Sequence, residues 1–346
     1  MKMPARPPAL SYSFSSLAGD AMFWTSIYAP STGKYLHWDK LRHLSPPKGI
    51  THEQWWSMLK LARMQVSKYL PLLTDASGHP FVFALPDPIP EMLHRIDQDA
   101  AGRIEVAEQN IANPATRDRY IVRSLAEEAI TSSQLEGAAT TRSVAKEMIR
   151  SRRKPRSRDE QMILNNYQTM RRIREIKGQP LTPALLLDLH RTLAHETMDD
   201  PSAVGRFRTS DDRVEVATQY NEVLHTPPPA EQLEKRLAAL CDFANGATPD
   251  YFVPPVIRSI ILHFWLAYEH PFVDGNGRCA RALFYWSMLK EGYWLCEFIS
   301  ISQIIRKGPA KYGRAFLYTE TDDNELTYFI LYHIEIIRRA IQELHD

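Results

Sequence analysis

The residues from His270 to Arg281 carry the most recognisable chemistry in the chain. In the order His-Pro-Phe-Val-Asp-Gly-Asn-Gly-Arg-Cys-Ala-Arg, they place an imidazole, a carboxylate, a Gly-Asn-Gly turn and two guanidiniums within twelve positions. His270 can accept a proton near neutral pH, and Asp274 can hold a Mg²⁺ ion that is shared with phosphates. The glycines let backbone N–H groups approach an anion closely, and the arginines add charge-assisted hydrogen bonds. This combination indicates a site that handles phosphates.

Two apolar segments flank this stretch, and both are predicted to be helices. The first runs from about residue 255 to 268, and the second continues from residue 282 to 292. The second helix would then begin at Gly275 to Arg278, where unpaired N–H groups and the helix dipole favour a bound anion. Arg278 and Arg281 are three residues apart and would share one face. A surface loop with solvated arginines explains any single one of these residues, but not the whole string.

The same string resembles the signature of the Fic family, His-x-Phe-x-Asp/Glu-Gly-Asn-Gly-Arg-x-x-Arg, at every defined position. The resemblance implies a mostly helical Fic fold and transfer of AMP from ATP to a Ser, Thr or Tyr hydroxyl of a target protein. It implies that His270 is the general base and that Asp274 holds Mg²⁺. The residues that it places around the phosphates are Gly275, Asn276, Gly277, Arg278 and Arg281, with Arg278 near the β-phosphate and Arg281 at the γ-phosphate.

A second motif lies upstream, at the end of a long amphipathic helix predicted for residues 116–137. Ser132 and Glu136 fall on one face of that helix. Read alone, Glu136-Gly137 is a helix end with a glycine cap. The segment also resembles the Ser/Thr-x-x-x-Glu-Gly/Asn inhibitory motif of many Fic proteins, which implies that Glu136 pairs with Arg281 and keeps it from the γ-phosphate. We therefore expect Ser132, Glu136 and Gly137 to inhibit the site.

Residues 205–226 alternate β-branched, aromatic and polar side chains before three prolines, which predicts a short β-hairpin among the helices. In position this hairpin resembles the Fic flap, which binds the backbone of the target by strand addition. The residues that we expect to dock the target are Gln219, Tyr220, Asn221, Glu222, Val223 and Leu224. An ordinary connecting loop is the alternative.

The remaining pattern is predominantly helical, because nearly every periodic segment has helical spacing. We expect a mostly α protein with three parts. These are an N-terminal accessory region of mixed structure (1–112), a catalytic core (113–300) that includes the inhibitory helix near 121–137, and a C-terminal helical extension (301–346). Within the accessory region we expect a short hairpin or extended segment over 23–38, a helix that opens at Thr51 and a strand over 81–85.

Composition restricts the class of partner. The 346 residues include 42 basic and 41 acidic side chains, so the net charge of +1 gives no general attraction to nucleic acid or to a membrane. The basic run at 150–158 lacks interleaved aromatic residues and contains Pro155, so we interpret it as a solvated loop and do not expect nucleic acid binding. Cys241, Cys279 and Cys296 form no C-x-x-C pair and suit a reducing compartment.

The expected location is cytoplasmic. No apolar run approaches 18 residues, and the N-terminus lacks the apolar core of a signal peptide. His190, His195 and His225 have no trustworthy ligand spacing, so we predict no structural metal.

Several alternatives stay open from the sequence. Gly277 stands where the death-on-curing branch of the family has lysine, so phosphorylation is not expected. Transfer of UMP or phosphocholine, and removal of AMP with Glu136 positioning a water, are compatible with the motif. A non-catalytic regulator that binds DNA or a partner is the alternative from another class, and the intact His270, Asp274 and Arg281 argue against it. Self-modification and a homodimer are both compatible with the resemblance.

Overall fold

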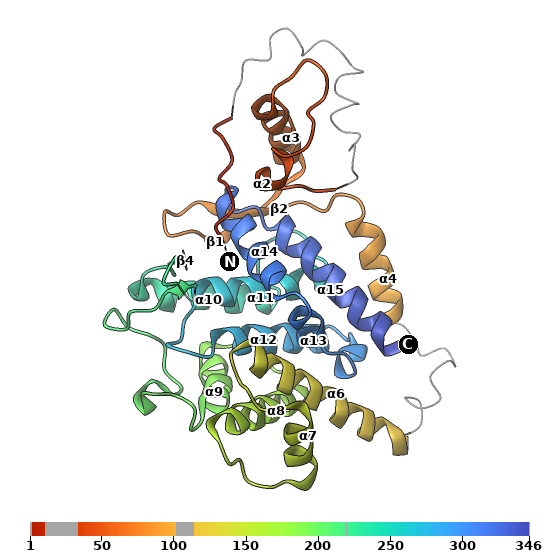
Figure 1. Cartoon of the computed structure of the whole chain (residues 1–346), viewed down its shortest axis with the longest axis vertical. Coiled ribbons are helices and arrows are strands. Elements are labelled where there is room, and N and C mark those ends of the chain that lie inside the picture. The colour runs from red at the N-terminus through yellow and green to blue at the C-terminus, as the bar shows by residue number, and fades with distance from the viewer. Residues whose placement is uncertain (1, 11–33, 102–113, 219, 346) are drawn as a thin grey trace.

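The computed structural model describes residues 2–10, 34–101, 114–218 and 220–345. Their architecture is mostly helical, as predicted, and the sheets of the described residues are two short antiparallel pairs. The N-terminal helices α2 and α3 lie at one end of the long axis, and α7 lies at the other (Figure 1). None of the described helices has the length and apolar character needed to cross a membrane.

The helices of the described residues begin and end as follows. They are α2 (Trp38–Leu41), α3 (His52–Val66), α4 (Ile89–Ala101), α6 (Pro114–Leu135), α7 (Arg142–Ser151), α8 (Arg158–Ile176), α9 (Pro183–Ala194), α10 (Leu233–Ala244), α11 (Pro255–Glu269), α12 (Asn276–Lys290), α13 (Ile301–Arg306), α14 (Pro309–Thr321) and α15 (Thr327–His345), with 3₁₀ turns η1 (Pro201–Ala203), η2 (Ala230–Gln232) and η3 (Trp294–Glu297). Hydroxyl side chains cap the N-termini of several of these helices. Thr51, Ser157 and Thr182 each accept a hydrogen bond from the backbone N–H three residues later.

Helices α11 and α12 form the centre of the molecule, and the loop between them carries the His270–Arg281 motif. In Figure 1, α14 and α15 lie above this pair, α6, α8 and α9 lie below it, and α10 packs beside α11. α11 is buried almost all round, with Ile260, Phe264 and Leu266 fully inaccessible, as its apolar sequence predicted. The three cysteines are free and buried. The motif loop is therefore held between two rigid, buried helices.

The first sheet joins the N-terminal region to the C-terminal helices. Strands β1 (Lys68–Thr74) and β2 (Pro80–Phe83) are antiparallel, and Val82 of β2 exchanges backbone hydrogen bonds with Asn324 and Leu326. One apolar cluster extends from Leu70 to Ile341, so both terminal regions share the core of the central pair. The division into three parts stays a prediction.

Two expectations in the N-terminal region fared differently. The predicted strand at 81–85 corresponds to β2. The hairpin or extended segment expected over 23–38 falls mainly outside the described residues, and its last residue, Trp38, instead begins α2. His37 caps this helix through its ring nitrogen, which accepts a hydrogen bond from the Asp39 N–H, so local capping prevailed over the β propensity of the segment.

Helix α6 is fixed in place by a buried carboxylate. Glu128 is 2% exposed and accepts hydrogen bonds from the Tyr285 hydroxyl (2.9 Å), the Ser300 hydroxyl (2.7 Å) and the Ser302 backbone N–H (3.1 Å). Tyr285 belongs to α12, and Ser302 belongs to α13. Glu128 therefore ties α6, which carries the upstream motif, to the helix that carries the two motif arginines.

We expect Glu128→Leu to lower the free energy of unfolding by about 1–3 kcal/mol, because the Ser302 N–H and the Tyr285 hydroxyl lose a buried acceptor. Denaturant unfolding followed by circular dichroism measures this change. Glu147→Leu, at an exposed position of α7, is the control and should change stability by less than about 0.5 kcal/mol. Equal effects of the two substitutions would contradict the role given to Glu128.

Candidate active site

His270 lies where α11 ends, in a left-handed backbone conformation (φ 47°, ψ 54°). This turn directs the chain into the loop and is stabilised by a hydrogen bond from the His270 N–H to the Leu266 carbonyl (3.1 Å). Nδ1 lies 3.1 Å from the Ala267 carbonyl oxygen. Because a carbonyl can only accept, Nδ1 carries the ring proton. Nε2 is therefore left with a free lone pair.

The protonation state of His270 suits a base. Burial lowers the pKa of His270 to about 4, although the hydrogen bond to Ala267 and the charge of Glu136 both act in the opposite direction. The ring is consequently neutral at physiological pH. A neutral imidazole with a free Nε2 can take a proton from a hydroxyl group in contact with it.

The loop after His270 is closed by Asn276, the first residue of α12. Its Oδ1 accepts from the Phe272 N–H (2.9 Å), and its Nδ2 donates to the Phe272 carbonyl (2.8 Å). The side chain that the resemblance places around the phosphates is thus engaged in shaping the loop. Gly275 precedes it with φ 85°, a conformation that favours glycine. This turn points the first N–H groups of α12 into the loop.

His190, in the C-terminal half of α9, packs against the loop and holds it through hydrogen bonds. Its Nε2 donates to the Asp274 carbonyl (3.0 Å), its Nδ1 accepts from the Gly205 N–H (3.1 Å), and its ring stacks on Phe272 at 3.9 Å. Burial lowers the pKa of His190 to about 4, which agrees with a neutral ring that donates once and accepts once. No local pattern predicts this role of His190, because its partner Asp274 lies 84 positions away in the chain.

Asp274 and Arg278 form a loose pair at the cavity. The Arg278 side chain is 1% exposed, and its Nη1 donates to the Leu193 carbonyl (3.2 Å). Its Nη2 lies 3.6 Å from Asp274 Oδ2, and its Nε has no hydrogen-bond partner among the described residues. The Asp274 side chain is half exposed, and its Oδ1 accepts from the Gly275 N–H. Both groups therefore retain capacity for a charged ligand.

Arg281 is fully engaged by the upstream motif. Its Nη2 lies 2.6 Å from Glu136 Oε1, its Nε donates to Ser132 Oγ (2.8 Å), and Nη2 also donates to the Ser132 carbonyl (3.1 Å). The expected Glu136–Arg281 pair is thus present in the structure. Burial opposes the charge of Glu136, but Arg281 holds the pKa of that carboxyl below its usual range. Gly137, with φ 98°, ends the segment as a left-handed cap.

Gly277 explains how Glu136 reaches the start of α12. A Cβ atom at Gly277 would lie 2.2 Å from Glu136 Oε1 and 3.0 Å from its Cδ. No side chain fits there while Glu136 occupies this position. The carboxylate therefore lies against the backbone of the first turn of α12, where the N–H groups and the helix dipole favour an anion.

Six of the residues described above line one cavity of about 270 Å³, whereas Arg278 and Arg281 are not among its lining residues. Its walls are Glu136, His270, Val273, Asp274, Gly275, Asn276 and Gly277, together with Arg213, Val214 and Glu215. The last three precede the hairpin and were not predicted to be site residues, because the sequence of a loop does not indicate which way its side chains face. The cavity thus brings the base, the carboxylate and the glycine turn together.

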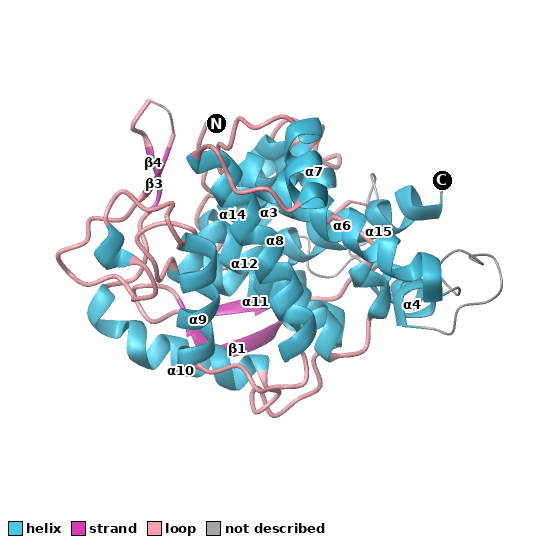
Figure 2. Ribbon diagram, turned by 90° about the horizontal axis from the view of Figure 1, so that it is seen from below, coloured by secondary structure: helices cyan, strands magenta, loops and turns pink. Residues whose placement is uncertain are grey.

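The predicted hairpin is present beside the cavity. β3 (Val216–Ala217) pairs antiparallel with β4 (Val223–His225), and the hairpin projects from the body (Figure 2). Tyr220 at its tip is 77% exposed. Asn221 adopts a left-handed turn conformation (φ 60°), Glu222 and Val223 are exposed, and Leu224 is half-buried. Gln219 lies outside the described residues.

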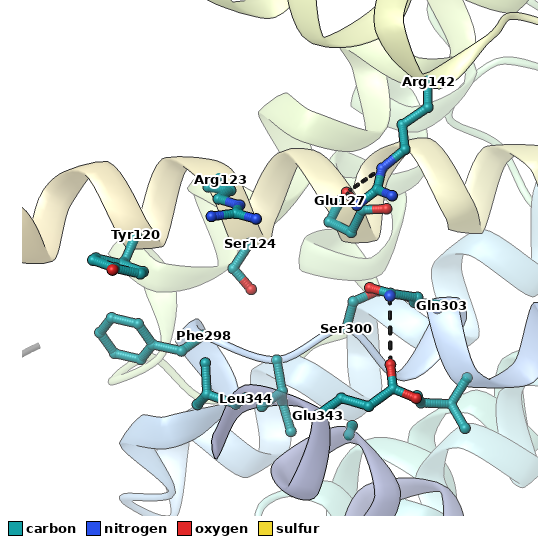
Figure 3. A pocket seen from close by; sticks show the side chains of 13 residues that line it. Tyr120, Arg123, Ser124, Glu127, Arg142, Phe298, Ser300, Gln303, Glu343 and Leu344 are labelled. Carbon is teal, nitrogen blue, oxygen red and sulfur yellow. Dashed lines mark hydrogen bonds and ion pairs between the residues drawn. The ribbon is translucent and has the colours of Figure 1, made fainter. Parts of the chain in front are cut away.

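A second cavity, of about 460 Å³, lies between α6, α13 and α15 (Figure 3). Two pairs of its polar side chains contact each other. Arg142 pairs with Glu127 (2.6 Å), and Gln303 donates to Glu343 (3.4 Å). Since it lacks the motif residues, we place the candidate active site at the smaller cavity.

The sequence comparison agrees with this placement. Residues 180–288 match the model of the Fic/DOC family. A relative named protein adenylyltransferase Fic, from Nematostella vectensis, is 32% identical over 118 residues, which are 34% of this chain and 25% of that protein. The chain therefore spans about a quarter of the length of this relative.

Solved structures share the fold. A Fic family protein from Desulfovibrio desulfuricans G20 superposes with a TM-score of 0.62 at 23% identity, over 80% of this chain and 76% of that one. A Fic domain containing signaling protein from Bacteroides thetaiotaomicron VPI-5482 gives 0.59 at 20% identity, over 73% of this chain and 95% of that one. Residues 180–288, which contain the loop from His270 to Arg281, thus match the Fic/DOC family model, and the solved Fic structures share the fold.

Proposed function

We propose that this protein transfers AMP from ATP to a Ser, Thr or Tyr hydroxyl of a protein, and that Glu136 inhibits the site at rest. The observation that carries the proposal is the neutral His270, which lines the same cavity as the first turn of α12 and Glu136 and whose Nδ1 is engaged by Ala267. Relatives named protein adenylyltransferases support the reaction type. Removal of AMP, UMP transfer and phosphocholine transfer are the alternatives within the same site.

The transfer is an in-line displacement at the α-phosphorus. The target hydroxyl gives its proton to His270 Nε2 as its oxygen bonds to phosphorus, and the bond to the departing pyrophosphate breaks. The N–H groups at the start of α12 and the buried Arg278 stabilise the negative charge. Arg281 takes the γ-phosphate once Glu136 has left it. Each group acts through atoms that have no hydrogen-bond partner among the described residues in this geometry, or that lose their partner when Glu136 leaves Arg281.

Asp274 fits a Mg²⁺ ion that arrives with the nucleotide. Magnesium sites of this kind use one or two carboxylates together with phosphates and waters, and Asp274 is half exposed beside the cavity. The described residues contain no group of three or more His, Cys, Asp or Glu side chains able to hold a metal by themselves. A magnesium ion held by Asp274 and the phosphates would supply charge neutralisation.

The hairpin is the proposed docking site for the target. Tyr220, Glu222 and Val223 of the hairpin are exposed, and residues 213–215, which lead into β3, line the cavity that contains His270. A strand of the target could add to β4 here. Backbone pairing depends little on the side chains of the target, so the target is defined here only as a protein with an accessible hydroxyl. A hydroxyl of the chain itself would satisfy the same chemistry.

We expect Glu136→Gly to raise self-labelling by α-³²P-ATP in Mg²⁺ by at least about tenfold, since a coupling of 1.4 kcal/mol already gives that factor. The substitution frees Arg281 for the γ-phosphate. Adding His270→Ala should abolish the signal, because the base is lost. Gel autoradiography measures both results.

The same experiment separates the alternatives. Label from γ-³²P-ATP would indicate a kinase, and label only from UTP would change the nucleotide. A wild-type protein that strips AMP from a labelled substrate, while Glu136→Gly does not, would assign Glu136 to de-AMPylation. Salt-dependent DNA binding that survives His270→Ala, without any transfer, would support the non-catalytic regulator.

The pH dependence of the transfer should follow His270. The base acts when it is neutral, and its pKa is about 4, so the rate should be level from about pH 7.5 to about pH 5 and fall as pH drops through about 4. Removing the Glu136 charge, which raises the pKa of His270, should move the fall to slightly lower pH. Initial rates in constant ionic strength buffers test this, with circular dichroism to confirm folding. A fall centred near the ordinary histidine value of 6.5 would contradict the assigned environment.

A further inference from the structure

The end of α11 has an unusually complete set of hydrogen bonds. A helix normally leaves its last four carbonyls without intrahelical partners. Here every carbonyl from Leu266 to Phe272 accepts a hydrogen bond. His270 and Asn276 satisfy three of them from within the motif itself. The carbonyls of Tyr268, Glu269, His270 and Pro271 accept hydrogen bonds from residue 208, which precedes the β3–β4 hairpin, and from residue 225, the last residue of β4.

Arg208 supplies most of these external bonds. Its Nε donates to the His270 carbonyl (2.8 Å), its Nη2 donates to the Glu269 carbonyl (3.2 Å) and also to the Pro228 carbonyl, and its backbone N–H donates to the Pro271 carbonyl (2.8 Å). The residue is 7% exposed. A planar guanidinium can hold several carbonyls at once, which a lysine ammonium on a flexible stem does less well. Its charge also complements the negative end of the helix dipole.

His225, the last residue of β4, supplies the remaining bond. Its Nε2 lies 2.8 Å from the Tyr268 carbonyl, and its Nδ1 lies 2.6 Å from Glu320 Oε2 of α14. A carbonyl and an ionised carboxylate can only accept, so both ring nitrogens donate and His225 is an imidazolium. It is 9% exposed. A second cation therefore joins the hairpin, the end of α11 and α14.

We propose that Arg208 and the His225 imidazolium are positioning residues for the reaction. Together they fix the left-handed turn of His270, with its Nδ1 on the Ala267 carbonyl. They also hold the base of the hairpin in a fixed position relative to that turn. The general base and the target-docking strand are then placed by one set of contacts. This role deepens the proposed function and rests on it for its kinetic consequence, whereas the geometry of His270 can be measured without any activity.

We call the contacts of Arg208 and His225 with the end of α11 the clamp. The charges around His225 make this clamp depend on pH. Facing it are Glu320 from α14 and Tyr268, Glu269 and His270 from the end of α11, with Arg208 beside the same carbonyls. Burial alone would lower the pKa of His225, but the hydrogen bond and charge of Glu320 raise it overall. A group with a raised pKa contributes its contact fully below the ordinary value, and the contact is lost as pH rises through the raised value. The clamp should therefore weaken on the alkaline side.

The test compares Arg208→Met with Arg206→Met in the Glu136→Gly background. Arg206 lies two residues earlier and pairs with Asp212 (2.7 Å) without touching α11, so it is a matched control. Histidine-selective ¹⁵N labelling, with the His270 signals assigned through His270→Gln, reports which ring nitrogen carries the proton. We expect Arg208→Met to mix the tautomers of His270 and lower kcat at least about tenfold, with KM for ATP within about twofold. Arg206→Met should change neither quantity.

Each remaining result decides the question. A single Nδ1–H tautomer in Arg208→Met, or equal kinetics in the two arginine variants, would overturn the proposal. If Arg208→Met fails to fold, Glu320→Gln tests the same clamp. Loss of this carboxylate should lower the pKa of His225 and so move the alkaline fall in rate to lower pH. An unmoved pH profile would overturn the proposal. If the Glu136→Gly parent transfers no nucleotide, the proposed function fails, while the ¹⁵N spectra still decide the role of Arg208.

Discussion

The hydrogen bonding of the carbonyls at the end of α11 is the constraint on which the site depends. A buried helix must end within the protein interior, and its last carbonyls need donors there. The left-handed turn at His270, the Asn276 side chain and the guanidinium of Arg208 provide them. The consequence is a loop with one conformation, in which a neutral imidazole and the first turn of α12 face the same cavity. The chemistry proposed for the site follows from how this helix ends.

The second constraint is steric and lies at Gly277. Because this residue has no side chain, the carboxylate of Glu136 can rest on the backbone where a phosphate would bind. Arg281 is then held by Glu136 and Ser132 together. Since Glu128 fixes α6 to α12 and α13, release of the site requires either rotation of the Glu136 side chain or displacement of the whole helix. In the proposed regulation, whatever moves α6 controls the enzyme.

The sequence predicted what local patterns encode. Helical spacing identified the long helices, and the spacing of the motif from His270 identified the loop with its charged groups. The Glu136–Arg281 contact required a family motif, because no local signal links positions 145 residues apart. His190 and Arg208 were missed, since their partners lie 84 and 62 residues away and their types fit ordinary structural roles. The first strand of the N-terminal sheet was missed because Pro71 interrupts it, which is tolerated only where a strand lies at an edge.

The most direct test of the central claim is a pair of crystal structures with ATP and Mg²⁺, one of the wild type and one of Glu136→Gly. We expect the wild type to keep the Glu136–Arg281 pair, with the γ-phosphate away from Arg281. In Glu136→Gly, Arg281 should contact the γ-phosphate, with the α-phosphorus aligned for a hydroxyl held at His270 Nε2. A wild-type complex with the γ-phosphate on Arg281 while Glu136 stays in place would contradict it.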